Sequence, residues 1–170
     1  MTYNIHPLFV HFPIAFLLLY SLIRILPFER LVPSLSWRHI QQILLLAGVL
    51  GAFLSNTTGE IAEHLVRPEE ALVEMHAFFA LASTWIYGLL LGGEILFTVN
   101  PYLSKKFPLG SLTTLLIKIE TLLTNRTLTL VLAVLGVVAI SLTGLLGGVM
   151  VYGTSADPLA PVILKILGLA

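Results

Sequence analysis

Four long apolar runs dominate the sequence, at residues 8–27, 40–57, 77–99 and 128–152. Each approaches or exceeds the roughly 20 residues that an α-helix needs to cross a hydrocarbon core about 30 Å thick. Because 57% of the 170 residues are hydrophobic and only 11% are charged, no separate soluble domain is expected. We therefore predict an all-α fold, an integral membrane four-helix bundle that forms a single transmembrane domain over residues 1–170.

The charged residues between the runs predict an orientation. The connections that follow the first and third runs carry the basic residues Arg24, Arg30, Arg38, Lys105, Lys106, Lys118 and Arg126. By the positive-inside bias these connections face the cytoplasm, which leaves both termini on the outer, periplasmic or lumenal, side. The connection between the second and third runs agrees, because it holds five glutamates against the single Arg67.

Two shorter segments have the spacing of surface helices. In residues 111–123 the apolar side chains recur on one stripe, which is typical of an amphipathic helix in the cytoplasmic interface. Residues 158–168 repeat this spacing after Asp157, a favoured capping residue, and predict a short interfacial helix on the outer side. That helix either covers the neighbouring histidines or simply anchors the chain in lipid.

The histidines are the polar residues of greatest interest. The chain has no cysteine, so histidine, methionine and carboxylate side chains remain as metal ligands. In the predicted topology His6, His11, His64 and His76 lie at the outer surface, and His39 alone lies at the inner one. His6 and His11 are separated by about 140° around a regular helix, so we expect them to have different roles.

This arrangement favours a haem site. Paired imidazoles on different helices are a common way for a membrane bundle to hold b-type haem, and glycines in the second and fourth runs would let a flat macrocycle approach the backbone. We predict His11 and His76 as axial ligands because they lie deepest, with His6 and His64 as a second pair or as supports of the cofactor-binding site. Each histidine or glycine taken singly also fits a purely structural role at a helix end or contact.

Carboxylates offer a second interpretation. Glu60, Glu63 and His64 would share one helical face and could bind a non-haem metal such as iron, manganese, zinc or copper. The same residues also fit a hydrated acidic connection. Near the inner end of the third run, Glu94 is a candidate for proton chemistry, although pairing with Arg24 or Lys105 would explain it equally well.

The opening segment resembles a known family. Residues 6–14 read HPLFVHFPI, the tripeptide Thr58-Gly59-Glu60 ends the second run, and His76 opens the third. This pattern resembles the bacterial membrane family catalogued as domain of unknown function 2231, which is marked by an HP-x-x-VHFPI opening. The resemblance implies a four-helix membrane protein. Because such proteins are often encoded near, or fused to, cytochrome-like electron carriers, it also implies a haem or redox role, without assigning ligands.

The sequence therefore predicts a membrane-embedded electron-transfer protein that binds haem b, or another histidine-ligated redox metal, near the outer face. It would exchange electrons with a quinone or a periplasmic carrier such as a cytochrome. The alternative is a cofactor-free accessory subunit that packs against a larger respiratory or photosynthetic complex or against other copies. We expect a bacterial plasma membrane or an internal photosynthetic membrane, and no nucleic-acid partner. A stand-alone enzyme is not expected, because the sequence contains no P-loop, dinucleotide fingerprint, nucleophile elbow or zincin motif.

Overall fold

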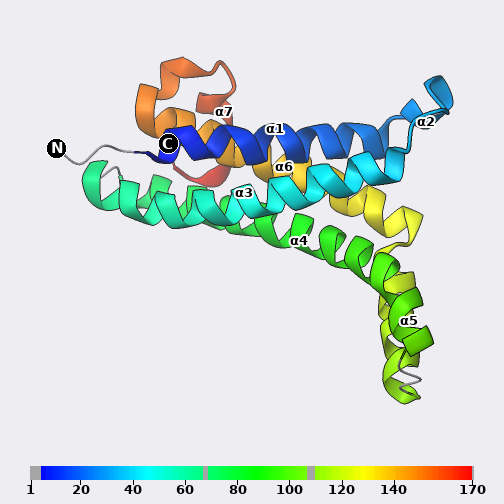
Figure 1. The fold of residues 1–170 in the computed structure, drawn as a ribbon. Coiled ribbons are helices and arrows are strands. Elements are labelled where there is room, and N and C mark those ends of the chain that lie inside the picture. The colour runs from blue at the N-terminus through cyan, green and yellow to red at the C-terminus, as the bar shows by residue number, and fades with distance from the viewer. Residues whose placement is uncertain (1–4, 67–68, 107–109, 170) are drawn as a thin grey trace.

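The computed structural model of the protein describes residues 5–66, 69–106 and 110–169, and these ranges contain helices and no strand. The helices are α1 (His6–Ile25), α2 (Phe28–Leu31), α3 (Trp37–Val66), α4 (Glu70–Lys106), α5 (Ser111–Leu123), α6 (Arg126–Tyr152), the short 3-10 helix η1 (Thr154–Ala156) and α7 (Ala160–Leu167). The predicted all-α fold class is confirmed (Figure 1).

Four of the described helices, α1, α3, α4 and α6, are long and apolar enough to cross a membrane. They form an up-and-down bundle in which α1 packs against α3 and α6, and α4 packs against the same two helices (Figure 1). The start of α1 therefore lies beside the end of α3, the start of α4 and the end of α6. We call this the histidine end, defined by His6, His64 and His76, and the opposite end, defined by Arg24 and Arg38, the arginine end.

The spanning helices extend beyond the apolar runs that predict them. The prediction places the second and third spans at residues 40–57 and 77–99, whereas α3 continues to Val66 and α4 runs from Glu70 to Lys106. Backbone hydrogen bonding continues through these polar turns, because leaving the hydrocarbon region does not by itself end a helix. Since α3 is continuous, His39 and His64 lie at opposite ends of the bundle, as the sequence predicts.

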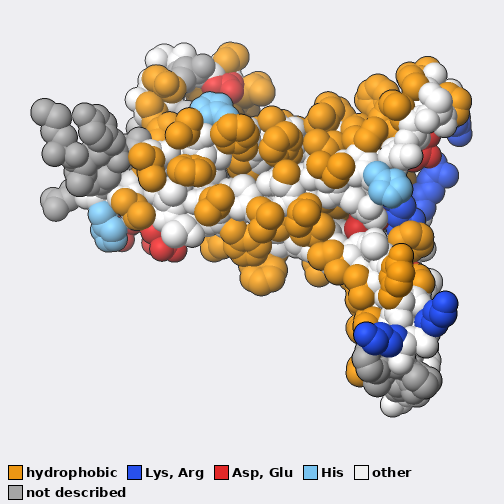
Figure 2. All heavy atoms as spheres, viewed as in Figure 1, with side chains coloured by type: hydrophobic (Ala, Val, Ile, Leu, Met, Phe, Trp, Pro, Cys, Tyr) orange, Lys and Arg blue, Asp and Glu red, His pale blue; other side chains and the backbone are white. Residues whose placement is uncertain are grey.

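The bundle buries its apolar side chains at mid-length and leaves many others on its surface. Leu17, Leu45 and Tyr87 are fully buried, whereas Ile43 and Trp85 are 66% and 65% exposed. In the view of Figure 2, hydrophobic side chains cover the length of the bundle between its two ends. Such a surface is stable in lipid, where apolar contacts replace water, and it supports the membrane location.

Two glycines allow the helices to approach closely in this core. A methyl group at Gly48 would overlap the side chain of Leu17, and one at Gly136 would lie 2.6 Å from the ring of Tyr87. The Tyr87 hydroxyl in turn shares a hydrogen bond of 2.8 Å with Ser21 Oγ. Glycine therefore makes room for Leu17 and for the Tyr87 ring in this interhelical packing, as is common in membrane bundles.

The two predicted surface helices are both present, at the two ends of the bundle. The last turns of α4, which contain Pro101, bend away from the bundle and pair with α5 (Figure 1). At the histidine end, the Asp157 carboxylate accepts a hydrogen bond of 2.8 Å from the Leu159 amide and so helps to start α7. Ala160 and Leu164 of α7 are buried against the end of α6.

Candidate functional site

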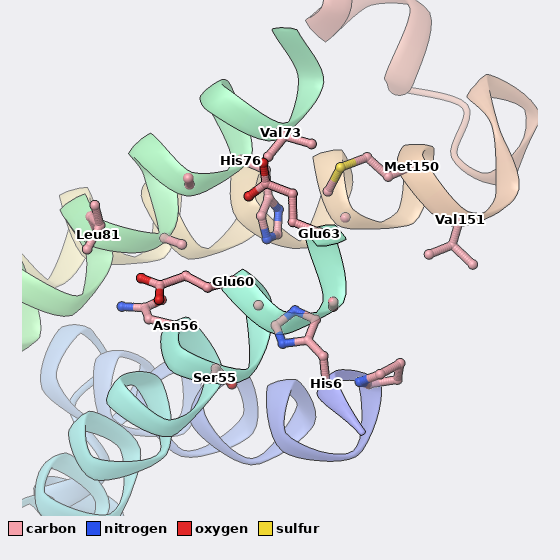
Figure 3. A pocket seen from close by; sticks show the side chains of 16 residues that line it. His6, Ser55, Asn56, Glu60, Glu63, Val73, His76, Leu81, Met150 and Val151 are labelled. Atoms are coloured by element: carbon pink, nitrogen blue, oxygen red, sulfur yellow. The ribbon is translucent and has the colours of Figure 1, made fainter. Parts of the chain in front are cut away.

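A cavity of about 230 Å³ lies at the histidine end, between α1, α3, α4 and α6 (Figure 3). The polar and sulfur-containing side chains that line it are His6, Ser55, Asn56, Glu60, Glu63, His76 and Met150. Residues far apart in the sequence meet here because the four helices alternate in direction. Polar groups within a membrane bundle commonly mark a functional site, so this cavity is the candidate site.

His6 is held by the last turns of α3. Its Nδ1 lies 3.0 Å from Thr58 Oγ1, and the Thr58 hydroxyl donates to the carbonyl oxygens of Leu54 and Ser55 at 3.0 and 3.1 Å. The tautomer of His6 that fits these contacts donates Nδ1–H to Thr58 Oγ1, while the Thr58 hydroxyl donates to the backbone. In that tautomer the lone pair of a neutral His6 is on Nε2.

The same arrangement recurs for His76, whose support comes from α6. His76 Nδ1 lies 3.0 Å from the backbone carbonyl oxygen of Thr143, which can only accept. The neutral ring is therefore protonated on Nδ1, and Nε2 has the lone pair. A glycine makes room for each ring, because a methyl group at Gly59 or Gly147 would lie 3.3 or 3.2 Å from the ring carbon Cε1 of His6 or His76.

The two rings enter the cavity from opposite sides, and a nitrogen of each points toward the space between them (Figure 3). Both residues line the same cavity. Metal-binding histidines in proteins usually donate the second ring N–H to a carbonyl or another fixed acceptor, which sets the tautomer and the orientation of the ring. His6 and His76 both have this support.

Ser55 adds an unsatisfied polar group to the cavity wall. Its side chain is only 8% exposed, and its hydroxyl has no hydrogen-bond partner within the described residues. The adjacent Asn56 instead donates to Thr84 Oγ1 at 3.2 Å. A buried hydroxyl is costly without a partner, so a molecule or ion with its bound water inside the cavity would satisfy Ser55.

The structure does not bring all the predicted site residues together. His11, predicted to pair with His76, is exposed, and its Nδ1 bonds to the Pro7 carbonyl oxygen of its own helix at 2.7 Å. His64 is exposed and does not line the cavity. His6 and His76 are thus the pair that faces the cavity, and the different roles expected for His6 and His11 agree with their positions.

The carboxylates of the second interpretation lie at the edge of the cavity. Glu60 and Glu63 are exposed and line it, but Glu60 points away from His6 and toward Asn56 (Figure 3). Across the described parts of the chain, no three histidine or acidic side chains are grouped so that they could ligate one metal ion. Glu60 and Glu63 therefore give the cavity an acidic edge rather than a ready set of metal ligands.

Glu94 belongs to a different polar cluster, at the arginine end. Arg38 Nε donates to Glu94 Oε2 at 2.9 Å, and Gln42 Nε2 donates to the same oxygen at 3.0 Å. The sequence suggested Arg24 or Lys105 as the partner, whereas Arg24 hydrogen-bonds to Thr129. Arg38 is the partner because α3 and α4 are antiparallel neighbours, which places the start of α3 beside the later turns of α4.

Sequence reasoning missed the residues that support the two rings. Thr58 and Gly59 belong to the tripeptide that carries the family resemblance, but Thr143 and Gly147 of α6 carry no comparable signal. Their spacing of four residues places them on one helical face, which becomes informative only when the partner helix is known. Met150 follows Gly147 by three residues and lies on this same face.

The fold and the cavity define an integral membrane protein with a histidine-lined site between four spanning helices. A family model described as "Predicted membrane protein (DUF2231)" matches residues 2–157. The chain therefore belongs to this family, and the resemblance that the opening motif indicates is confirmed. The search of the curated proteins found no match, and neither did the search of the solved structures.

Proposed function

We propose that the protein is a membrane-embedded electron-transfer protein in which His6 and His76 ligate a redox metal. The observation that supports this most strongly is the matching support of the two rings: each bonds through Nδ1 to a fixed oxygen, and a nitrogen of each points toward the same cavity. A redox metal bound there would supply a one-electron couple between a quinol or reduced periplasmic carrier and an acceptor. By the positive-inside bias, this site lies near the outer face of the membrane.

The form of the metal follows from the size of the cavity. Sites that enclose a drug-sized ligand usually measure about 300–1,000 Å³, and a haem is larger than most such ligands. The cavity of about 230 Å³ is smaller than such sites, although its imidazoles have the chemistry of axial ligands. The residues present fit a metal ion with imidazole ligands and a small amount of water, so we favour this form over haem b.

Elemental analysis combined with a redox titration tests the proposal on the full chain, purified in mild detergent from its native membrane. We expect a bound metal that changes oxidation state reversibly, and its loss in His6→Ala and His76→Ala. His11→Ala is the matched control, because His11 is exposed and bonds to its own helix. A reduced-minus-oxidised spectrum with the sharp bands of a haem would show that the cofactor is haem b and not a metal ion alone. A chain without metal in all preparations would overturn the proposal.

One observation favours a second candidate, a cofactor-free subunit that packs against a larger membrane complex. Methyl groups added at Gly88 and Gly92 of α4, or at Gly144 and Gly148 of α6, would meet no other helix within 4 Å in the part of the chain that the structure describes. Such glycine pairs, four residues apart, allow another helix to approach closely. Copurification of stoichiometric partner proteins with a chain that binds no metal would support this candidate.

A further inference from the structure

Met150 also lines the cavity, on the side of His76, and adds a soft donor to the two imidazoles (Figure 3). We infer that the site binds copper(I), with Met150 as a ligand together with the two histidines. This inference rests on the proposed function, since it uses the same two imidazoles. It adds a particular metal ion and a donor that lies outside the histidines and carboxylates considered above.

The placement of Met150 follows from the face of α6 that holds His76. Thr143 accepts the Nδ1–H of His76, Gly147 faces the ring, and Met150 is one further turn along the same helix. One face of α6 thus orients the imidazole, makes room for it and adds a thioether at the cavity. The three donors come from α1, α4 and α6, so binding would link three spanning helices.

The chemistry of these donors selects for copper(I). Thioether sulfur is a soft ligand that favours Cu(I), imidazole binds copper well, and hard ions such as Mg²⁺ or Mn²⁺ prefer clustered oxygen ligands. Within the ranges that the structure describes, no cluster of three histidine or acidic groups is present to serve those harder ions. The donor set of two imidazoles and one thioether therefore suits a soft ion best.

Charge supports the same choice. Imidazole binds metals in its neutral form and a thioether carries no charge, so this donor set would add no negative charge to the site. The site also lies within a bundle whose surface is largely apolar. The Born cost of burying an ion rises with the square of its charge, so a monovalent ion costs about a quarter as much as a divalent ion of the same size. Glu60 and Glu63, exposed at the edge, would attract cations toward the cavity without having to ligate them.

Competition with chromophoric chelators tests the inference on the full chain in mild detergent under reducing, anaerobic conditions. The probes are Cu(I) and Zn(II), each added alone. We expect one Cu(I) per chain, weakened by about tenfold or more in Met150→Leu, while Zn(II) affinity in the same variant changes by less than about threefold. Met75→Leu is the matched control, because Met75 packs beside α7 and does not line the cavity.

X-ray absorption at the copper edge gives a direct test of the ligands in the wild-type chain. Wild-type protein with selenomethionine in place of methionine should show a selenium scatterer bound to copper beside the imidazole nitrogens. Bound Cu(I) without selenium, and unchanged in Met150→Leu, would overturn the role of Met150. Binding of another metal but not Cu(I), lost in His76→Ala, would overturn copper and leave the proposed function intact. A folded chain that binds no metal would overturn both.

Discussion

The two ends of the bundle treat their polar side chains in opposite ways. At the arginine end the charged groups pair with each other, since the carboxylate of Glu94 accepts from both Arg38 and Gln42. At the histidine end His6 and His76 use Nδ1 to bond to the protein and direct Nε2 toward a cavity. The first cluster pairs its charged groups with each other, whereas the second places two imidazoles at the wall of one cavity.

This difference shows why polarity within a membrane segment is an incomplete guide to function. Glu94 and His76 both lie on α4, and each stands out in an apolar sequence. The surrounding helices decide their roles: α3 neutralises Glu94 with Arg38, whereas α6 orients the His76 ring through the Thr143 carbonyl. We therefore expect substitutions at the arginine end to affect stability and those at the histidine end to affect binding.

The largest expected effect is the loss of metal affinity in a variant at the histidine end, compared with the loss of stability in a variant at the arginine end. His76→Ala removes one of the two imidazoles and should lower metal affinity by more than the roughly 10–100-fold typical of changes in outer supports. Arg38→Ala should leave metal affinity unchanged and lower the thermal stability of the metal-free protein. Metal titration and thermal melting of both variants in detergent test this crossed pattern. Equal loss of metal in the two variants would remove the distinction between the ends.

A second prediction concerns Thr58, which is expected to orient His6 without binding the metal. Thr58→Val keeps the shape of the side chain but removes the acceptor for His6 Nδ1–H, so metal affinity should fall by about 10–100-fold. The neighbouring Thr57 is exposed and bonds to the Phe53 carbonyl oxygen of its own helix. Thr57→Val should therefore change the affinity by less than about twofold. Similar affinities of the two variants would show that Thr58 does not orient His6.

Two buried serines, one in the core and one at the cavity, allow the effect of removing a single hydroxyl group to be compared. Ser21 Oγ is paired with Tyr87, so Ser21→Ala should lower the free energy of unfolding by about 1–3 kcal/mol. Ser55 Oγ has no partner among the residues described, so Ser55→Ala should leave the metal-free protein equally stable or more stable. Reversible unfolding in mixed micelles measures both. A loss at Ser55 as large as that at Ser21 would mean that the cavity hydroxyl is already satisfied.

The sequence predicts the fold well because the hydrocarbon core imposes simple requirements. Runs of about 20 apolar residues identify four spanning helices. An amphipathic stripe identifies α5, and Asp157 marks the start of the segment that forms α7. The predicted spans do not include the polar turns that extend α3 and α4, because hydrophobicity marks only the part of a helix that lies in the hydrocarbon core.

The site is predicted only in part, since depth along a helix does not determine the direction of a side chain. His76 is correctly placed beside a second histidine at one end of the bundle. The choice of His11 as its partner assumes that depth decides the pairing, but rotation about α1 turns His11 to the surface and His6 toward the cavity. Methionine is among the expected ligand types, but nothing in the sequence singles out Met150, because the sequence does not show which face α6 presents to His76.

The smallest expected effect concerns the ion pair that defines the arginine end. Arg38 and Glu94 are 41% and 18% exposed, so the pair is only partly shielded from its surroundings. A double-mutant cycle with Arg38→Gln and Glu94→Gln should give a coupling energy of about 0.6 kcal/mol, the average for polar pairs between membrane helices. A matched cycle with Arg38→Gln and His76→Ala should give no coupling, because the two residues lie at opposite ends. Coupling of similar size in both cycles would show that the ends communicate through α4, and the separation of stability from binding would then fail.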